Sequence, residues 1–305
     1  MIINKHSRKW AISKSGAAFT LIELSIVLVI IGLIVGGILT GRDLINAAET
    51  RAQISQIDKY QVAVRTFQGK YGYLPGDIPD PFASRFGFKA RGTTPATGDG
   101  NGVLDGVQGD NAPNWVYYAQ GTGENAVFWV DLSQAGLIDG SFSTASSTVG
   151  PATTPITGAG LDAYFPKAKI GNGTYVYVRS GGSGGYIGSG NYDTVWYLPV
   201  GVNFFGVTAL TSINYQGDTA SNQGIRVIQA YNIDKKIDDA IPVTGTVTIF
   251  ATDWGSNVLV SGTAATCADA RGNGGGWYTA ATTNRYSTEI NNGSGMNCGL
   301  QFQFQ

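Results

Sequence analysis

An uninterrupted apolar run close to the N-terminus constrains this chain more than any other feature. Residues 19–40 read FTLIELSIVLVIIGLIVGGILT, and Glu23 is the only charged side chain among them. A helix of this length is about 33 Å long, which matches the ~30 Å hydrocarbon core of a bilayer. Residues 1–18 hold four basic side chains and no acid, a pattern that favours a cytoplasmic N-terminus. The sequence therefore predicts a transmembrane helix over residues 19–40.

The helical pattern continues beyond the apolar run. Side chains recur at three- and four-residue steps at Leu44, Ala47, Ile54, Ile57, Gln61, Val64 and Phe67. The segment GKYGYLPGD then supplies glycine and proline, which end a helix near residues 69–72. A secretory signal is cut at small residues after its apolar run, and the continuing helix argues against such a cut. We therefore expect a soluble continuation of the helix over residues 41–71 and a globular domain over residues 72–305.

Glu23 is unusual because it lies inside the apolar run. A carboxylate within a membrane span is costly, and it is usually paired or functional. The alternative is an acid at the membrane interface that reaches out to water. That alternative is weak, since Glu23 lies four residues into the run and no basic residue accompanies it.

The residues around Glu23 resemble a known processing signal. Residues 16–24, GAAFTLIEL, are similar to the N-terminal signal of type IV pilins and type II secretion pseudopilins. The resemblance implies that a prepilin peptidase cuts between Ala18 and Phe19, that the Phe19 amine is methylated, and that Glu23 becomes the fifth residue. Ala18 stands where the family usually has glycine, and a cut after Gly16 would make Glu23 seventh. A pair between the Phe19 amine and a neighbouring subunit's Glu23 would then set the axial register, because a buried carboxylate is tolerable when paired.

Four later segments carry the same resemblance, to a subgroup of prepilin-type proteins. They are YGYLPGDIPD, GDGNG, FWVDLSQAGLIDGSF and AYNIDKKIDDAIPVTGTV. Residue patterns predict helices over residues 124–135 and 221–234, strands over residues 174–179, 194–198 and 244–251, and a surface loop over residues 141–160. The expected fold class is α+β, with a long N-terminal helix packed on an antiparallel β-sheet.

The segment GDGNGVLDG carries oxygen-bearing side chains at short spacing. Asp99, Asn101 and Asp105 alternate with glycines, as they do in calcium-binding loops, although the register differs from that of an EF-hand. These three residues are candidate ligands of a structural calcium ion, for which the resemblance to major pseudopilins, which hold such an ion, gives a precedent; no other cofactor is expected. The candidates for further ligands are Asp77, Asp110 and Glu124. A plain Asp-Gly and Asn-Gly turn is the alternative.

The chain has two cysteines, Cys267 and Cys298. The compartment beyond the inner membrane is oxidising, which favours a disulfide between them over two reduced thiols. Closing a loop of this length contributes about 3.5–4 kcal/mol in the chain-entropy description.

Composition argues against several classes of function. The only histidine, His6, precedes the apolar run, so the globular domain has no histidine base or histidine metal ligand. Residues 181–185, GGSGG, fit the G-x-S-x-G pattern of serine hydrolases but lie in a Gly/Ser-rich run. Removal of residues 1–18 takes away four of the 20 basic side chains and leaves 16 basic against 21 acidic ones. No cluster of basic residues contains interspersed aromatic residues. We therefore expect neither a nucleic-acid partner nor an enzyme.

The sequence supports three hypotheses of function. The first is a structural subunit, a pilin or pseudopilin of a type IV pilus or type II secretion system, held in the bacterial inner membrane with its globular domain in the periplasm. Its partners would be copies of itself, other pilin-like subunits, the prepilin peptidase and methylase, the assembly platform and membrane lipid. The second is a minor or tip pilin-like protein that acts as an adhesin or cargo-binding module, which low abundance would indicate. The third is an enzyme on a membrane stalk, but no group of candidate catalytic residues in the sequence supports it.

Overall fold

The computed structural model describes residues 20–93, 97–106, 121–147, 154–180, 201–214, 217, 219–249, 267–269 and 285–305. The chain divides into two compact units, one up to Asn46 and one from Ala47 to Gln305. The predictions for residues 194–198, 250 and 251 lie outside the described residues. The α+β class is confirmed, with a long N-terminal helix and a six-stranded antiparallel sheet.

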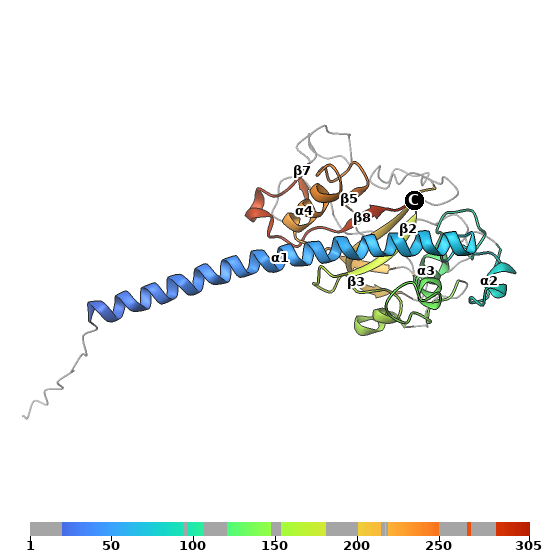
Figure 1. The fold of residues 1–305 in the computed structure, drawn as a ribbon, viewed down its shortest axis with the longest axis horizontal. Coiled ribbons are helices and arrows are strands. Elements are labelled where there is room, and N and C mark those ends of the chain that lie inside the picture. The colour runs from blue at the N-terminus through green and yellow to red at the C-terminus, as the bar shows by residue number, and fades with distance from the viewer. Residues whose placement is uncertain are drawn as a thin grey trace, which may run out of the picture. The chain divides into compact units, whose positions relative to one another are not determined.

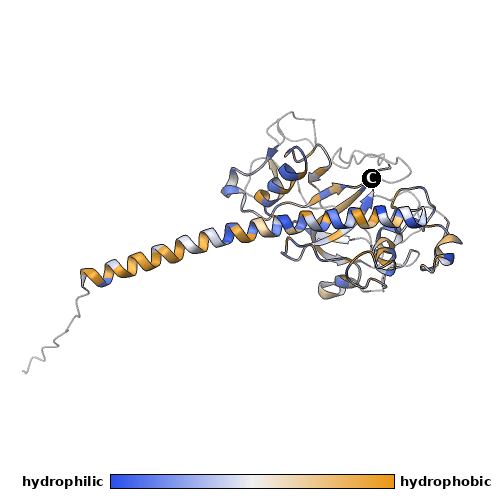
Figure 2. Ribbon diagram, viewed as in Figure 1, coloured by the Kyte–Doolittle hydropathy of each residue, from blue (hydrophilic) through white to orange (hydrophobic). Residues whose placement is uncertain are grey.

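The long helix α1 extends over Leu21–Tyr71 and ends where the glycine and proline signals predict. Gly72 follows with φ +79°, a left-handed conformation that terminates helices and suits glycine. The part of α1 in the first unit is apolar, its large side chains are exposed, and it is long and apolar enough to cross a membrane. Figure 2 shows this part almost uniformly hydrophobic. It is therefore a candidate membrane span.

The remainder of α1 belongs to the second unit and is amphipathic. Its buried side chains recur at three- and four-residue steps and are Thr50, Gln53, Gln56, Ile57, Tyr60, Ala63, Val64 and Phe67. Two of them bind the backbone of the turn before strand β2. Gln53 Oε1 accepts the Ile170 N–H at 3.1 Å, and Gln56 Oε1 accepts the Lys169 N–H at 2.9 Å. Directional bonds thus supplement hydrophobic burial where α1 meets the sheet.

Strand β3 is the centre of the larger sheet, and every pairing in this sheet is antiparallel. The first half of β3 lies between β2 and β8, its second half pairs with β1 and β4, and β5 pairs with β8. The strands are β1 (Ile156–Thr157), β2 (Tyr175–Ser180), β3 (Asn203–Ile213), β4 (Thr219–Asn222), β5 (Val247–Ile249) and β8 (Leu300–Gln303). A separate two-stranded sheet holds β6 (Ala268–Asp269) and β7 (Arg285–Tyr286).

Of the shorter helices, α2 and α3 precede the first strand in sequence and the others lie between strands, and Figure 1 shows their arrangement. They are α2 (Phe82–Arg85), α3 (Gly123–Gln134), α4 (Val227–Ile237) and the 3-10 turns η1 (Gly158–Ala163) and η3 (Ile290–Gly293). Helix α3 agrees with the prediction for residues 124–135. It is buried along most of its length, so it forms part of the core rather than a surface element.

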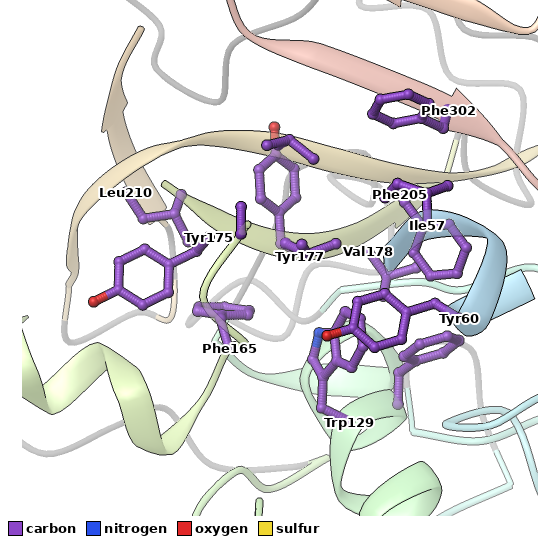
Figure 3. Close-up of a cluster of buried hydrophobic side chains, with 14 of the residues drawn as sticks. Ile57, Tyr60, Trp129, Phe165, Tyr175, Tyr177, Val178, Phe205, Leu210 and Phe302 are labelled. Carbon is purple, nitrogen blue, oxygen red and sulfur yellow. The ribbon is translucent and has the colours of Figure 1, made fainter. Parts of the chain in front are cut away.

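Aromatic side chains dominate the core between α1, α3 and the sheet. Figure 3 shows Tyr60 from α1, Trp129 from α3 and Phe205 from β3 meeting there. The Tyr60 and Trp129 ring centroids are 5.0 Å apart in an edge-on arrangement, which aromatic pairs prefer. On β3, Gly206 faces Tyr177 across the strand pair, and a Cβ at Gly206 would lie 2.1 Å from the Tyr177 ring. Glycine is required there because the ring occupies the place of a side chain.

Two predictions near β3 were incomplete. The helix expected from residue 221 begins only at Val227, because Thr219–Asn222 pairs with the second half of β3 as strand β4. Strand β3 itself was not predicted. Its segment NFFGVTALTSI mixes apolar, small and polar residues without a clean alternation, and its strand conformation depends on partners along both edges.

Candidate metal centre

Three segments that are far apart in sequence bring acidic side chains together. Asp77 follows the end of α1, Asp99 lies in the glycine-rich loop, and Glu124 lies in the first turn of α3. One carboxylate oxygen from each lies within 4.8 Å of the others. Asp77 and Glu124 are buried and Asp99 is partly exposed. Two of the three acids are therefore shielded from solvent, and the group is accessible to solvent at Asp99.

The glycine-rich loop turns its backbone N–H groups toward Asp77. Gly100 and Gly102 adopt φ values of +76° and +83°, which side-chain-bearing residues rarely adopt. Asp77 Oδ1 accepts the Gly100 N–H at 2.7 Å, and Oδ2 accepts the Gly102 N–H at 2.8 Å. The alternation of glycine with polar residues thus wraps the loop around one carboxylate.

Glu124 holds the same loop at its two ends. Its Oε1 accepts the Gly98 N–H at 2.8 Å and its Oε2 accepts the Asp105 N–H at 2.8 Å. The Glu124 N–H in turn donates to the Asp105 carbonyl at 3.0 Å. Each carboxylate oxygen has two lone pairs, so these bonds leave capacity for a further ligand.

The electrostatics of the group favour a cation. Burial, above all, raises the pKa of Asp77 to about 7, and the charge of Asp99 acts in the same direction. Burial also raises the pKa of Glu124 well above its usual range, and the charges of Asp77 and Asp105 add to this effect. Three carboxylates so close together cost free energy when all are ionised. Oxygen ligands from carboxylates are those that Ca²⁺ prefers, so the residues present fit a hard divalent cation.

A buried ion pair fixes the backbone beside Asp77. Arg91 Nη2 and Asp131 Oδ1 are 2.7 Å apart, and both side chains are fully buried. Asp131 Oδ2 accepts the Gly76 N–H at 2.7 Å, and Arg91 Nη1 donates to the Gly76 carbonyl at 3.1 Å. Gly76 also lies so near α3 that a Cβ would be 2.4 Å from the Glu124 carbonyl oxygen. These contacts hold Asp77 next to Glu124.

Asn203, the first residue of β3, anchors the other side of the loop. Its Oδ1 accepts the Leu104 N–H at 2.9 Å, and its Nδ2 donates to the Gly102 carbonyl at 2.8 Å. Sequence reasoning missed Asn203, Arg91 and Asp131. No local spacing could reveal Asn203, because the fold alone brings it to a loop about a hundred residues earlier.

The predicted ligands take different places. Asp99 belongs to the group of three acids, whereas the exposed Asn101 stabilises the loop itself. Asn101 Nδ2 donates to Asp99 Oδ2 at 2.9 Å, and its Oδ1 accepts the Val103 N–H at 2.7 Å. Asp105 is fully buried, and its Oδ1 lies 3.5 Å from Ser180 Oγ. The structure thus joins Asp99 to Asp77 and Glu124, the residues expected only as further ligands, and Asp110 lies outside the described residues.

At the start of α1, Glu23 contacts its own helix. The Thr20 N–H and Thr20 Oγ1 both donate to Glu23 Oε2 at 2.8 Å, and the Glu23 N–H donates to Thr20 Oγ1 at 3.3 Å. This reciprocal arrangement is a capping box. Ala18 and Phe19, where cleavage and methylation were predicted, lie outside the described residues.

The disulfide between Cys267 and Cys298 is present, as predicted. Both cysteines are fully buried. Cys298 exchanges backbone hydrogen bonds with Ile225, and the Cys267 carbonyl accepts the Ser287 N–H at 3.0 Å. The bond therefore links the small sheet to the segment that enters β8.

Comparison of the chain with protein-family models, curated proteins and solved structures finds no match. The architecture alone, a long apolar N-terminal helix followed by an antiparallel sheet, fits a pilin-like protein.

Proposed function

We propose that this chain is a structural subunit of a pilin-like filament, a pilin or pseudopilin of a type IV pilus or a type II secretion system. One observation carries the proposal. Helix α1 is continuous over Leu21–Tyr71, apolar and exposed in its first part and packed on an antiparallel sheet in its second. Such a helix can lie in a membrane before assembly and among neighbouring helices afterwards, because both surroundings bury its apolar side chains.

The N-terminal signal gives the order of events in this proposal. A prepilin peptidase cuts between Ala18 and Phe19 on the cytoplasmic side of the inner membrane, and the Phe19 amine is methylated. The assembly platform then moves the subunit from the lipid into a filament of its own copies and other pilin-like subunits. Glu23 of one subunit pairs with the Phe19 amine of a neighbour, which offsets the cost of a buried carboxylate.

The capping box adds a constraint to this role of Glu23. Both Thr20 donors bind the same oxygen, Oε2, so Oε1 is the atom that would accept a neighbour's amine. Thr20 thereby orients Glu23 toward the end of its own helix. Loss of Glu23 removes a helix cap as well as the proposed intersubunit partner, and an experiment must separate the two.

A pair of variants separates them. Thr20→Ala removes the Oγ1 cap and keeps the carboxylate, whereas Glu23→Ala removes the carboxylate with its bonds to Thr20 and keeps the Oγ1 cap. We expect Glu23→Ala to reduce filament recovery at least tenfold, and Thr20→Ala to retain most of it because one cap costs only about 1 kcal/mol. The measurement is the subunit yield in sheared surface filaments relative to total subunit. Wild-type assembly of Glu23→Ala would refute the register role.

A structural calcium ion is the second part of the proposal. Asp77, Asp99 and Glu124 would bind it, and its positive charge would compensate their crowded negative charges. The ion would order the loop between Gly98 and Asp105 rather than take part in chemistry.

A further inference from the structure

Few large hydrophobic side chains are exposed in the part of the second unit that the structure describes. Among its described residues they are Val62, Phe82, Phe86, Ile237, Ile241 and Met296. Four of them form two pairs, one at α2 and one at the end of α4. Grouped exposed apolar side chains often mark interaction sites, and the charges around these two pairs differ.

The pair at α2 lies in a basic and aromatic surface. We define the α2 surface as Lys70, Phe82, Arg85 and Phe86, all of which are exposed. The Arg85 guanidinium lies over the Phe82 ring at 5.7 Å, and the Lys70 ammonium lies 4.9 Å from the centroid of the Tyr71 ring. The Phe86 and Tyr71 ring centroids are 5.2 Å apart. This surface therefore presents two positive charges beside apolar rings.

The pair at α4 lies beside acids. We define the α4 surface as Ile237, Asp238, Asp239 and Ile241, at the end of the helix and in the turn that follows. Asp239 Oδ1 accepts the Ile241 N–H at 2.8 Å, so the turn itself holds this acid next to the exposed isoleucine. Lys236 immediately precedes the surface, which is thus mixed at the helix end and acidic in the turn.

The start of α4 and the α2 surface lie at opposite ends of the packed part of α1, and α4 is too short to close the distance between the two surfaces. Gln229 in the first turn of α4 donates to Glu49 at 2.9 Å, whereas the α2 surface contacts Tyr71. The stretch of α1 from Glu49 to Tyr71 is about 33 Å long, while all of α4 is only about 16 Å long. Figure 1 shows α4 and α2 well separated along this stretch.

We propose that the α2 surface of one subunit docks on the α4 surface of the next copy. The phenylalanines would pack on Ile237 and Ile241, with Lys70 and Arg85 beside Asp238 and Asp239. Charges at the edge of such a contact fix orientation more than affinity. A contact between two different surfaces is head-to-tail, and it generates an open helical filament when the rotation between successive subunits does not close a ring. This inference rests on the proposed function and names the contact between its globular units.

Cysteine cross-linking of the full chain in cells tests the contact. Phe86→Cys and Ile241→Cys are introduced into one chain, whose native cysteines are buried and already bonded to each other. Because every subunit then carries a cysteine on each of the two surfaces, mild oxidation should give a ladder of disulfide-linked dimers, trimers and longer products. Cells that express the two single variants together should give dimers only.

Val62 supplies the matched control. It is 61% exposed, against 45% for Phe86, but it lies outside both surfaces. Chains with Val62→Cys and Ile241→Cys should give no ladder. An equal ladder from this control, or dimers from Phe86→Cys alone, would overturn the head-to-tail contact.

Filament recovery of each strain is measured in parallel, so that the inference and the proposed function can fail separately. A ladder that only the Phe86 and Ile241 pair produces supports the contact. Filaments without that ladder overturn the contact and leave the proposed function standing. If the wild-type chain yields neither filaments nor, in its paired-cysteine form, a ladder, both are overturned.

Discussion

At the scale of single residues, a substitution of Asp99 can distinguish a calcium site from a plain hydrogen-bonded turn. Asp77 and Glu124 each accept two backbone N–H groups, so substituting either would disrupt the loop directly. Both oxygens of Asp99 instead bind Asn101, by its N–H at 3.1 Å and by its Nδ2 at 2.9 Å. Asp99→Asn is therefore the mildest change that removes a charge from the group.

We expect calcium to stabilise the wild-type chain and Asp99→Asn to lose this effect. Ligand at about 100 times its Kd adds about 2.7 kcal/mol, which raises the Tm by roughly 5–10 °C for a domain of this size. Thermal melts in detergent, with calcium and with a chelator, measure the shift. Asp139→Asn is the control, because this exposed acid lies away from the group and its loss should leave the shift intact. Equal shifts for Asp99→Asn and wild type would contradict the site.

The residue scale also shows what sequence can and cannot predict about the site. Asp99 was found because its glycine-rich surroundings are a local signal. Asp77 and Glu124 were recognised only as further candidates, because α1 and α3 bring them to the loop through long-range packing. Asn203 has no local signal at all, since its role depends on where β3 begins.

At the scale of elements, a buried contact joins α4 to β7. Tyr286 Oη donates to Asp234 Oδ2 at 2.8 Å, and the Ala240 N–H donates to Asp234 Oδ1 at 3.1 Å. Burial raises the pKa of Asp234 to about 6, and the charges of Asp238 and Asp239 act in the same direction. The folded chain therefore holds the Asp234 proton to a higher pH than the unfolded chain does.

This shift predicts how stability depends on pH. The contribution is fully present below the unfolded pKa of about 4 and is lost as the pH rises through about 6. Asp234→Asn removes this loss of stability at higher pH, because an amide does not ionise. The contact with Tyr286 can be kept, since the Tyr286 hydroxyl can accept a hydrogen bond from the new amide. We expect the variant to gain stability relative to wild type between pH 4.5 and pH 8, as urea midpoints will measure. The exposed Asp58 gives the control Asp58→Asn, whose difference from wild type should stay constant across the same range.

The same scale explains which elements the sequence predicted. Helix α1 was predicted well, since the apolar run, the helical periodicity and the terminating glycines are all signals within its own segment of sequence. Helix α4 was placed too early, because Thr219–Asn222 has no intrinsic signal that distinguishes a helix from a strand added to β3. Strand β3 was missed for a related reason: Gly206 weakens its intrinsic preference, and the Tyr177 ring that covers Gly206 comes from another strand.

At the scale of the whole molecule, the disulfide is the covalent link that shortens the path between the small sheet and β8. Reduction should lower the free energy of unfolding by roughly 2–4 kcal/mol. Urea denaturation with and without reductant measures this change. A chain with both Cys267→Ala and Cys298→Ala should unfold at a lower urea concentration than wild type, and the reductant should not change its midpoint. An unchanged wild-type midpoint after verified reduction would contradict the expected contribution.

The glutamine contacts between α1 and the turn before β2 have a mechanical consequence. Gln53 and Gln56 grip the backbone at three points, Lys167, Lys169 and Ile170. Interdigitated apolar side chains already resist sliding of the helix against the sheet. The hydrogen bonds to backbone atoms add a directional restraint, so a pull or a twist applied to residues 47–71 is transmitted to the sheet. The globular unit would then travel as a rigid load when its helix is drawn along.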